Sequence, residues 1–158
     1  MKDRSFKMIM TLSEIFDSRC ILLKLAGTTK DAAFQELVDA IAAVHPECDR
    51  AAMLAALWER EKKLSTGISS GVAIPHAPFG GIGTIAGAVG ISKAGIEYDS
   101  LDKKPVHVIF MLVMGEGEKE NHLHILDQIS TLVRTDALTL IKDAQTAQEV
   151  HEILSRFN

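Results

Sequence analysis

The sequence predicts a single layered domain of the α/β or α+β class. About four short segments have the apolar, β-branched composition of strands, and segments with a helical spacing of apolar residues lie before and after them. The chain has 158 residues, 47% of them hydrophobic and 24% charged, so it can bury one substantial core. No internal repeat or low-complexity linker divides it. We therefore expect one domain over residues 11–158, preceded by a leader over residues 1–10.

Capping residues and apolar periodicity locate the elements of the first half. Thr11 can cap a first short helix, Thr28 or Thr29 a second and Asp49 a third, because each side chain offers an oxygen to a main-chain N–H of the first turn. The predicted order is a helix over residues 12–16, a strand over 20–25, a helix to 44, a helix over 50–63 and a strand over 72–74.

The second half contains the longest strand signal. Residues 106–114 are almost continuously apolar, as in a strand that is covered on both faces. Asn121 can cap a helix that begins at His122, and Thr146-x-x-Glu149 has the spacing of a capping box. The predicted order is a loop over residues 77–83, strands over 84–91 and 106–114, an acidic loop over 115–118, and helices over 122–133, 137–141 and 147–157.

The composition argues against several classes of function. The net charge is −4 and no cluster of basic residues or zinc-finger spacing occurs, so we expect no nucleic-acid partner. No segment has the length of a membrane span or the form of a secretory signal, so we expect a cytoplasmic protein without direct membrane insertion. The glycine motifs that bind nucleotides and the serine-hydrolase elbow are both missing, so we expect no cofactor.

The cysteines and histidines do not have the spacing of a metal site. Cys20 and Cys48 fit no Cys-x-x-Cys pattern and are expected to be inert, reduced thiols. His122 and His124 are two residues apart, so their side chains point to roughly opposite sides of a helix. We therefore expect no zinc site, with His122 facing inward and His124 facing water.

His76 is the first candidate for chemistry. It follows a loop with two glycines, Gly67 and Gly71, then a short β-branched strand and Pro75. Such rigid surroundings hold an imidazole in one orientation, which lowers the barrier to a group transfer. An imidazole attacks phosphorus when one ring nitrogen is unprotonated and the other is held by a hydrogen bond.

His122 and Arg60 are the second and third candidates. His122 shares a helical face with Leu126 and Ile129, and a helix N-terminus at this point would attract an anion such as phosphate. Arg60 is either a surface residue paired with a neighbouring glutamate or a guanidinium that holds phosphate oxygens in bidentate fashion. Structural roles are expected for the remaining histidines: His45 at a helix end, His107 in a strand and His151 on an exposed face of the last helix.

These residues together resemble one family. The chain is similar to the fructose/mannitol-type enzyme IIA domain of the bacterial phosphoenolpyruvate-dependent sugar phosphotransferase system, which includes the nitrogen-regulatory enzyme IIA branch. The resemblance covers about residues 11–157. It rests on Arg60-Glu61, Ser65-Thr66-Gly67-Ile68, Gly71-Val72-Ala73-Ile74-Pro75-His76, Lys104-Pro105-Val106-His107 and His122-Leu123-x-x-Leu126.

The resemblance implies a sandwich with a central mixed sheet flanked by helices. It also implies that His76 carries the phosphoryl group in a site shared with His122 and Arg60. The donor would be an HPr-like phosphocarrier protein, and the acceptor would be a cysteine of an enzyme IIB in sugar uptake. The alternative role is that of a nitrogen-regulatory module, in which phosphorylation of His76 controls binding to other proteins.

The loop before His76 departs from the family pattern at one position. The usual loop reads Gly-Ile-Gly-x-Gly, and Ser69 replaces its middle glycine. If this position has a positive φ, a serine costs roughly 1 kcal/mol. We also expect a shallow apolar docking rim around His76, with Phe79 and Ile82 as its candidates.

Overall fold

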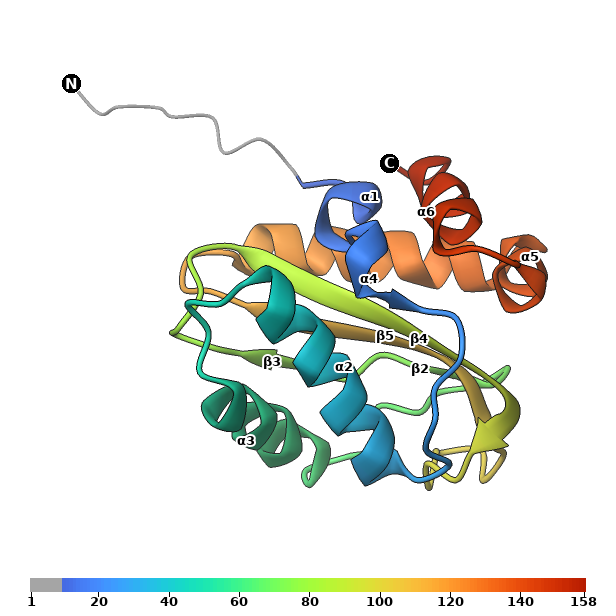
Figure 1. Cartoon of the computed structure of the whole chain (residues 1–158), viewed down its shortest axis with the longest axis horizontal. Coiled ribbons are helices and arrows are strands. Elements are labelled where there is room, and N and C mark those ends of the chain that lie inside the picture. Colours follow the sequence, from blue (N-terminus) through green and yellow to red (C-terminus); the bar gives the residue numbers. More distant parts are fainter. Residues whose placement is uncertain (1–9) are drawn as a thin grey trace.

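The computed structural model describes residues 10–158, which form a β-sheet between two layers of helices (Figure 1). Most of the predicted leader, residues 1–9, lies outside the described residues, so the domain boundary at residue 11 stays a prediction. The elements in chain order are α1 (Leu12–Ile15), the 3-10 helix η1 (Ser18–Cys20), β1 (Ile21–Leu22), α2 (Lys30–Val44), α3 (Arg50–Glu61), β2 (Val72–Ala73), β3 (His76–Pro78), β4 (Ile85–Ile96), β5 (Val106–Met114), α4 (Lys119–Val133), α5 (Ala137–Asp143) and α6 (Ala147–Ser155).

The described sheet has five strands and mixed pairing. Its order is β1-β4-β5-β2, and β3 also pairs with β5. β4 and β5 are antiparallel, whereas the other pairs are parallel. β2 and β3 follow each other along the same edge of β5, with Val72 opposite Val108 and His76 opposite Leu112. Pro75 lies between them and has no N–H to donate, so the ladder is interrupted just before His76.

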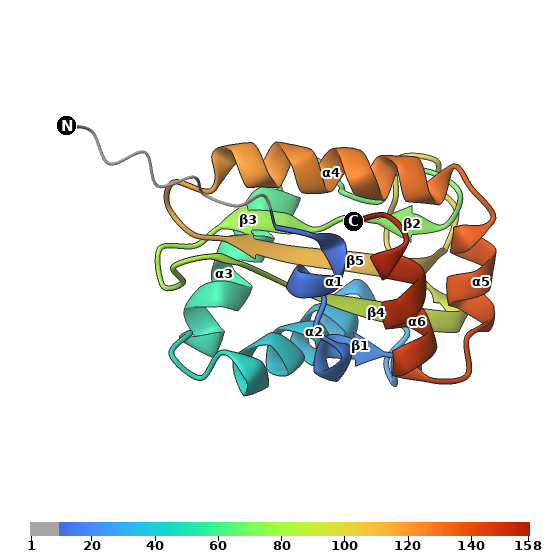
Figure 2. The same cartoon turned by 90° about the horizontal axis from the view of Figure 1, so that it is seen from above.

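The two faces of the sheet bury two separate cores. Val108, Phe110 and Leu112 point toward α1, α4, α5 and α6, whereas the alternate residues Ile109 and Met111 point toward α2 and α3. Figure 2 shows α4 on one side of the sheet and α2 and α3 on the other. Every residue of β5 except His107 is buried, which confirms a central strand covered on both faces. The predicted fold class, one domain with a central mixed sheet, is thereby confirmed.

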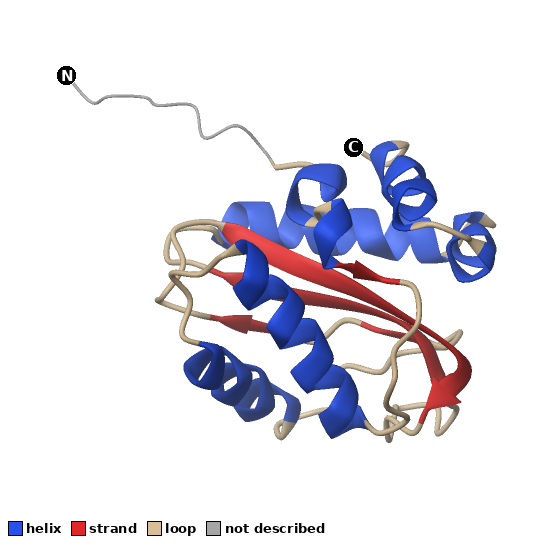
Figure 3. Ribbon diagram, in the orientation of Figure 1, coloured by secondary structure: helices blue, strands red, loops and turns tan. Residues whose placement is uncertain are grey.

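The predicted caps begin four of the helices. Thr11 forms a complete capping box with Glu14, and Thr29, not Thr28, accepts from the N–H of Ala32. Asp49 caps α3 and Thr146 caps α6. In α6 only half of the expected box forms, because the Glu149 carboxylate accepts from the Gln145 N–H. The helices and the loops between them are distinguished in Figure 3.

Several predicted boundaries are wrong. The strand expected over residues 20–25 is reduced to Ile21–Leu22, since Cys20 ends a 3-10 turn, although the Leu25 N–H still bonds to Ile91 O at 2.9 Å. The loop expected over residues 77–83 begins with β3, because β5 offers a free edge there. β4 extends to Ile96 through a register shift after Ile91.

The predicted start of α4 is also wrong. The helix begins at Lys119 with Glu118 as its N-cap, three residues before the expected start at His122. The Asn121 side chain is not a cap but a buried bridge. Its Nδ2 donates to Glu118 Oε2 at 2.7 Å, and its Oδ1 accepts from the Met10 N–H at 3.1 Å.

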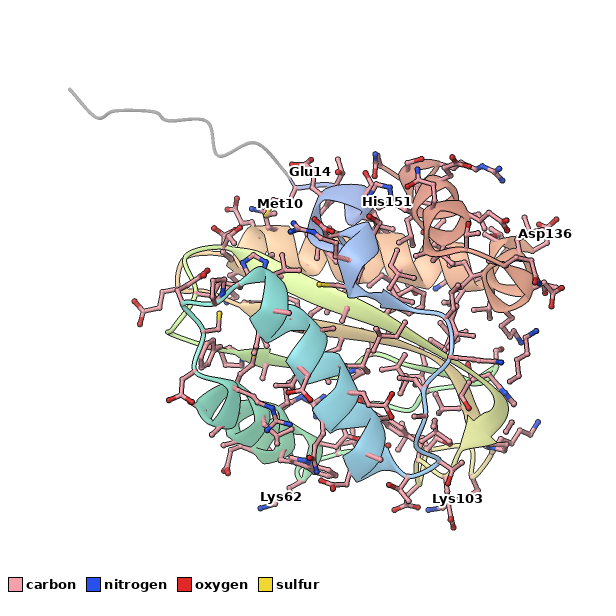
Figure 4. The ribbon with its side chains drawn as sticks, in the orientation of Figure 1. Met10, Glu14, Lys62, Lys103, Asp136 and His151 are labelled. Atoms are coloured by element: carbon pink, nitrogen blue, oxygen red, sulfur yellow. The ribbon has the colours of Figure 1, made fainter. Side chains whose placement is uncertain are left out.

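The histidines with expected structural roles are held by local contacts. His45 is the C-cap of α2, and the Nδ1 atom of His107 lies 2.9 Å from Ser92 O. His151 is half-buried and not exposed as predicted, because its Nε2 donates to Ser13 O at 2.8 Å beside α1 (Figure 4). Cys20 and Cys48 are free and buried, and burial raises the pKa of Cys20 to about 11.

Candidate active site

The loop from Ser65 to Gly71 is held by main-chain hydrogen bonds that lead to His76. The Ile68 N–H donates to Val72 O at 3.0 Å, and the Ile74 N–H donates to Thr66 O at 3.0 Å. Gly67 is required by packing, since a Cβ at this position would lie 2.5 Å from Ser100 Cβ. The loop therefore fixes the strand that carries the histidine.

The condition for strain at Ser69, a positive φ, is not met. Ser69 is absent from the described residues with positive φ, and its neighbour Ser70 has a φ of 58°. Gly71 follows with a φ of 74°. The replacement of the family glycine by Ser69 is therefore compatible with the backbone of this loop, and the strained serine is the next one along the chain.

His76 has a defined ring orientation. Its Nδ1 atom lies 2.7 Å from Ile74 O, a carbonyl that can only accept, so Nδ1 carries the proton and Nε2 carries the lone pair. The break at Pro75 makes this possible, because the ladder to β5 resumes only at Pro75 O, which accepts from the Leu112 N–H. The contact of Nδ1 with Ile74 O is thus the hydrogen bond to one ring nitrogen that a nucleophilic imidazole requires.

Burial lowers the pKa of His76 below its usual 6.5. The hydrogen bond to Ile74 and the charge of Glu61 act in the opposite direction, and the charge of Arg60 lowers the pKa further. At neutral pH the ring is therefore uncharged, and Nε2 is available as a nucleophile or acceptor.

His122 lies next to His76, as expected, although it is not at the helix terminus. The ring centroids are 5.1 Å apart. His122 is the fourth residue of α4, and its N–H bonds to Glu118 O, so this N–H cannot bind an anion. The ring atom Nε2 of His122 is buried and has no hydrogen-bond partner within the described part of the chain. Buried polar atoms without a partner are rare in folded proteins, and this one belongs to the ring that lies beside His76.

Arg60 completes one side of the same cleft. It lies in the last turn of α3, and its Nη1 donates to Leu64 O at 2.9 Å. Of the two interpretations left open for Arg60, an ion pair with Glu59 or Glu61 is not observed among the described residues, and Arg60 lines the cleft. The cleft encloses about 360 Å³ and is lined by Arg60, His76, Pro78, Met114, Gly115, Gly117, Glu118, Lys119 and His122. The three predicted site residues are thus brought together from α3, β3 and α4.

Two other predicted features lie apart from this cleft. His124 does not line the cleft, and it is half-buried and not fully exposed to water as predicted. Ile82 is 5% exposed and belongs to the core beneath α2 and α3, so it is not part of a docking rim, while Phe79 is half-buried against the same core.

The low pKa of His122 makes stability depend on pH. Burial, together with the charge of His76, lowers the pKa of His122 from 6.5 to about 4. Below pH 6.5 the unfolded chain binds a proton at this position that the folded chain does not bind, so stability falls as the pH drops from 6.5 toward 4.

We therefore expect the variant His122→Gln to lose less stability than the wild type when the pH is lowered from about 7.5 to about 5. Urea unfolding at the two pH values measures this difference, with His124→Gln as the control. Equal losses for the wild type and for His122→Gln would contradict a depressed pKa at this position.

Comparison with known protein families bears on this site. Residues 14–157 match the family model described as "Phosphoenolpyruvate-dependent sugar phosphotransferase system, EIIA 2". The chain belongs to this family. The match spans α4 and β3 as well as α3, so it contains the whole cleft.

Curated EIIA relatives have both sugar-specific and regulatory names. The chain is 32% identical over 148 residues to the "PTS system fructose-specific EIIA component" of Haloferax volcanii and covers 96% of it. It is 31% identical over 147 residues to the "Nitrogen regulatory protein" of Pseudomonas aeruginosa, again covering 96%. These alignments include 93% and 92% of this chain. The chain matches only 23% of the length of the Bacillus subtilis "PTS system fructose-specific EIIABC component", at 32% identity over 93% of this chain.

Solved EIIA structures have the same fold. The nitrogen regulatory protein IIA-Ntr of Neisseria meningitidis superposes with a TM-score of 0.84 at 29% identity, covering 90% of this chain and 97% of that one. The Escherichia coli complex of enzyme IIAMtl with phosphorylated enzyme IIBMtl gives a TM-score of 0.74 at 13% identity, covering 89% and 97%. No helix within residues 10–158 is long and apolar enough to cross a membrane.

The sequence does not reveal that Glu61 supports the site of this EIIA domain. Its carboxylate is 2% exposed and accepts from Lys30 Nζ at 2.8 Å, from Thr66 N at 3.0 Å and from Thr66 Oγ1 at 2.6 Å. Thr66 Oγ1 also lies 2.7 Å from the Tyr98 hydroxyl. The network anchors the loop that holds Ile74 and thereby His76. The signal for Glu61 in the sequence is its place in the Arg60-Glu61 pair.

Proposed function

We propose that this EIIA domain is a phosphoryl carrier in which His76 Nε2 accepts a phosphoryl group from the phosphohistidine of an HPr-like protein. The single observation that carries the proposal is the 2.7 Å contact between His76 Nδ1 and Ile74 O, which leaves Nε2 with a lone pair in the cleft. Among the other lining residues, Arg60 and Lys119 provide cations and His122 provides a second imidazole.

The step is a displacement at phosphorus. The Nε2 lone pair of His76 forms a new P–N bond while the P–N bond of the donor breaks, and its electron pair returns to the donor imidazole. In onward transfer a cysteine thiolate of an enzyme IIB attacks the same phosphorus, and the electron pair returns to His76 Nε2. Neither step requires a cofactor, because the chemistry consists of positioning and charge stabilisation.

Arg60 and His122 have complementary parts in this proposal. The Arg60 guanidinium offers donors in a planar fork that matches phosphoryl oxygens. The neutral His122 ring donates from Nε2, the buried atom that has no partner in the described structure. A phosphoryl group on His76 would satisfy this atom, so the stabilising contact exists only when the group has arrived.

The test is a mass measurement on the intact protein. We expect the wild type, incubated with phosphoenolpyruvate, enzyme I and an HPr-like carrier, to gain the mass of one phosphoryl group. The bond should break in mild acid and survive alkali, because a phosphoramidate is labile to acid and a phosphoserine is not. No mass gain, or a gain that survives acid, would refute the proposal.

The protein that receives the phosphoryl group from His76 differs between two possible roles. Sugar uptake is the first role. The sugar-specific relatives and the IIA–IIB complex of the structural neighbour support an enzyme IIB cysteine as the acceptor. The cytoplasm is the compartment in which such a carrier would act.

Similarity to the regulatory relatives supports the second role. The nitrogen regulatory protein of N. meningitidis has a TM-score of 0.84, compared with 0.72 for the mannitol IIA of E. coli. In this role the phosphorylation state of His76 controls contacts with other proteins. Transfer of phosphate to a purified IIB cysteine would favour uptake. Selective capture of regulatory partners by either the unphosphorylated protein or His76→Asp would favour regulation.

A further inference from the structure

A cavity larger than the His76 cleft lies at the N-terminal end of α2. It encloses about 780 Å³ and is lined by Thr28, Lys30, Gly95, Glu97, Tyr98, Asp99, Lys103, Lys104 and Pro105. The Glu97 N–H bonds to Thr28 O at 3.1 Å, which holds the segment before α2 against the loop between β4 and β5. Figure 4 shows Lys103 at the same end of the molecule as the start of α2. None of these residues lines the cleft of His76.

The lining combines three amino groups with two carboxylates. Lys103 Nζ lies 2.9 Å from Asp99 Oδ1, but both side chains are highly exposed, at 77% and 82%, so this ion pair is weak and easily exchanged. Within the described residues, the Lys104 ammonium and the Glu97 carboxylate form no ion pair within 4 Å and no side-chain hydrogen bond, although the charge of Lys104 acts on the neighbouring Asp102 carboxylate. Both kinds of group are therefore available to a ligand.

We infer that this cavity binds a small phosphorylated polyol, such as a sugar phosphate. The amino groups of Lys30, Lys103 and Lys104 suit a phosphate monoester, since ammonium groups bind phosphate oxygens by charge-assisted hydrogen bonds. The carboxylates of Glu97 and Asp99 would repel a bare anion, but they accept hydrogen bonds from hydroxyl groups. A ligand with phosphate at one end and hydroxyls at the other satisfies both sets.

The cavity is connected to His76 through Lys30, an inference that rests on the proposed function. Lys30 Nζ lies 4.3 Å from the centroid of the Tyr98 ring and 2.8 Å from Glu61 Oε1, so it faces both the cavity and the buried network. Glu61 in turn holds Thr66, Thr66 O holds the Ile74 N–H, and Ile74 O holds His76 Nδ1. A phosphate that draws Lys30 away from Glu61 loosens this chain of contacts. Bound ligand therefore slows phosphoryl uptake at His76.

Binding is tested first, without any phosphoryl transfer. The probe is fructose 1-phosphate, titrated against the full chain by calorimetry, with fructose and inorganic phosphate as comparisons. We expect fructose 1-phosphate to bind more tightly than either comparison. The double variant Lys103→Ala/Lys104→Ala should weaken it by about tenfold or more, since two charge-assisted contacts are lost. The matched control is Lys93→Ala/Lys142→Ala, which removes the same charge from a different cavity.

The outcomes separate the site from the proposed carrier role. Absence of binding, equal affinity for inorganic phosphate, or an equal loss in both double variants overturns the site, whether or not His76 is phosphorylated. If the site is present, fructose 1-phosphate should slow phosphoryl uptake by the wild type but not by Lys103→Ala/Lys104→Ala, whose uptake without ligand stays normal. Uptake by the wild type that is unchanged by saturating ligand overturns the coupling to His76.

Discussion

Replacement of His76 by glutamine is expected to abolish phosphoryl uptake completely. Glutamine is close to histidine in size and can still donate to Ile74 O, so the local fold should survive. Its amide nitrogen has no basic lone pair, however, and cannot attack phosphorus. Mass measurement of the intact variant after incubation with the phosphorylated donor should show the unmodified protein alone.

His107 provides the matched control for this experiment. Its Nδ1 atom also lies close to a main-chain carbonyl, at 2.9 Å from Ser92 O, and its side chain is also half-buried. It lies near the start of β5, whereas His76 pairs with Leu112 near the end of that strand. His107→Gln should therefore be phosphorylated like the wild type. A phosphoryl group on His76→Gln, or its loss from His107→Gln, would place the acceptor elsewhere.

The elements that the sequence predicts well are those whose signal is local. Thr11, Asp49 and Thr146 begin helices where expected, because a capping oxygen acts within three residues of its own position. The boundaries of β5 are also correct, because an uninterrupted apolar run has few alternatives at the centre of a sheet.

The elements that the sequence predicts poorly depend on distant partners. β3 forms from His76–Pro78 only because β5 has a free edge beside it, and nothing within those three residues indicates a strand. Asn121 looks like a helix cap, but a contact with Met10, 111 residues away, uses its side chain instead. Tertiary contacts thus override local preference at both positions.

The same distinction applies to the site. His76, His122 and Arg60 were found from their residue types and motifs, and the structure brings all three to one cleft. The role of Glu61 is not predicted from the sequence, because a glutamate near a helix end usually faces solvent. Its importance depends on Lys30, 31 residues earlier, and on Thr66 in the following loop. Only the folded chain shows that this carboxylate is buried.

The substitution Glu61→Gln is expected to destabilise the protein by about 3 kcal/mol, as does the removal of one partner from a buried ion pair. The carboxylate accepts three hydrogen bonds, from Lys30 Nζ, Thr66 N and Thr66 Oγ1. An amide can keep the geometry of these contacts, because its oxygen can accept from Lys30 Nζ and Thr66 N while its NH₂ group donates to the Thr66 hydroxyl. It removes the negative charge, however, so the Lys30 ammonium loses its counter-charge and the hydrogen bonds to Thr66 are no longer charge-assisted. Urea unfolding at neutral pH measures the loss, and Glu59→Gln, which changes an exposed residue of the same helix, should stay within about 0.5 kcal/mol of the wild type.

A double-mutant cycle with Lys30→Met shows whether the loss of stability in Glu61→Gln comes from the ion pair between Lys30 and Glu61. The Lys30→Met variant has no ammonium group that could lose its counter-charge. In this background Glu61→Gln should therefore lower the free energy of unfolding by at least about 1 kcal/mol less than it does in the wild type. Strictly additive losses would mean that the pair contributes nothing beyond its separate side chains. Glu61→Gln should also slow phosphoryl uptake more than its stability loss explains, because Thr66 and Ile74 then hold the His76 ring less firmly. An unchanged uptake rate in the folded variant would remove Glu61 from the set of residues that position the nucleophile.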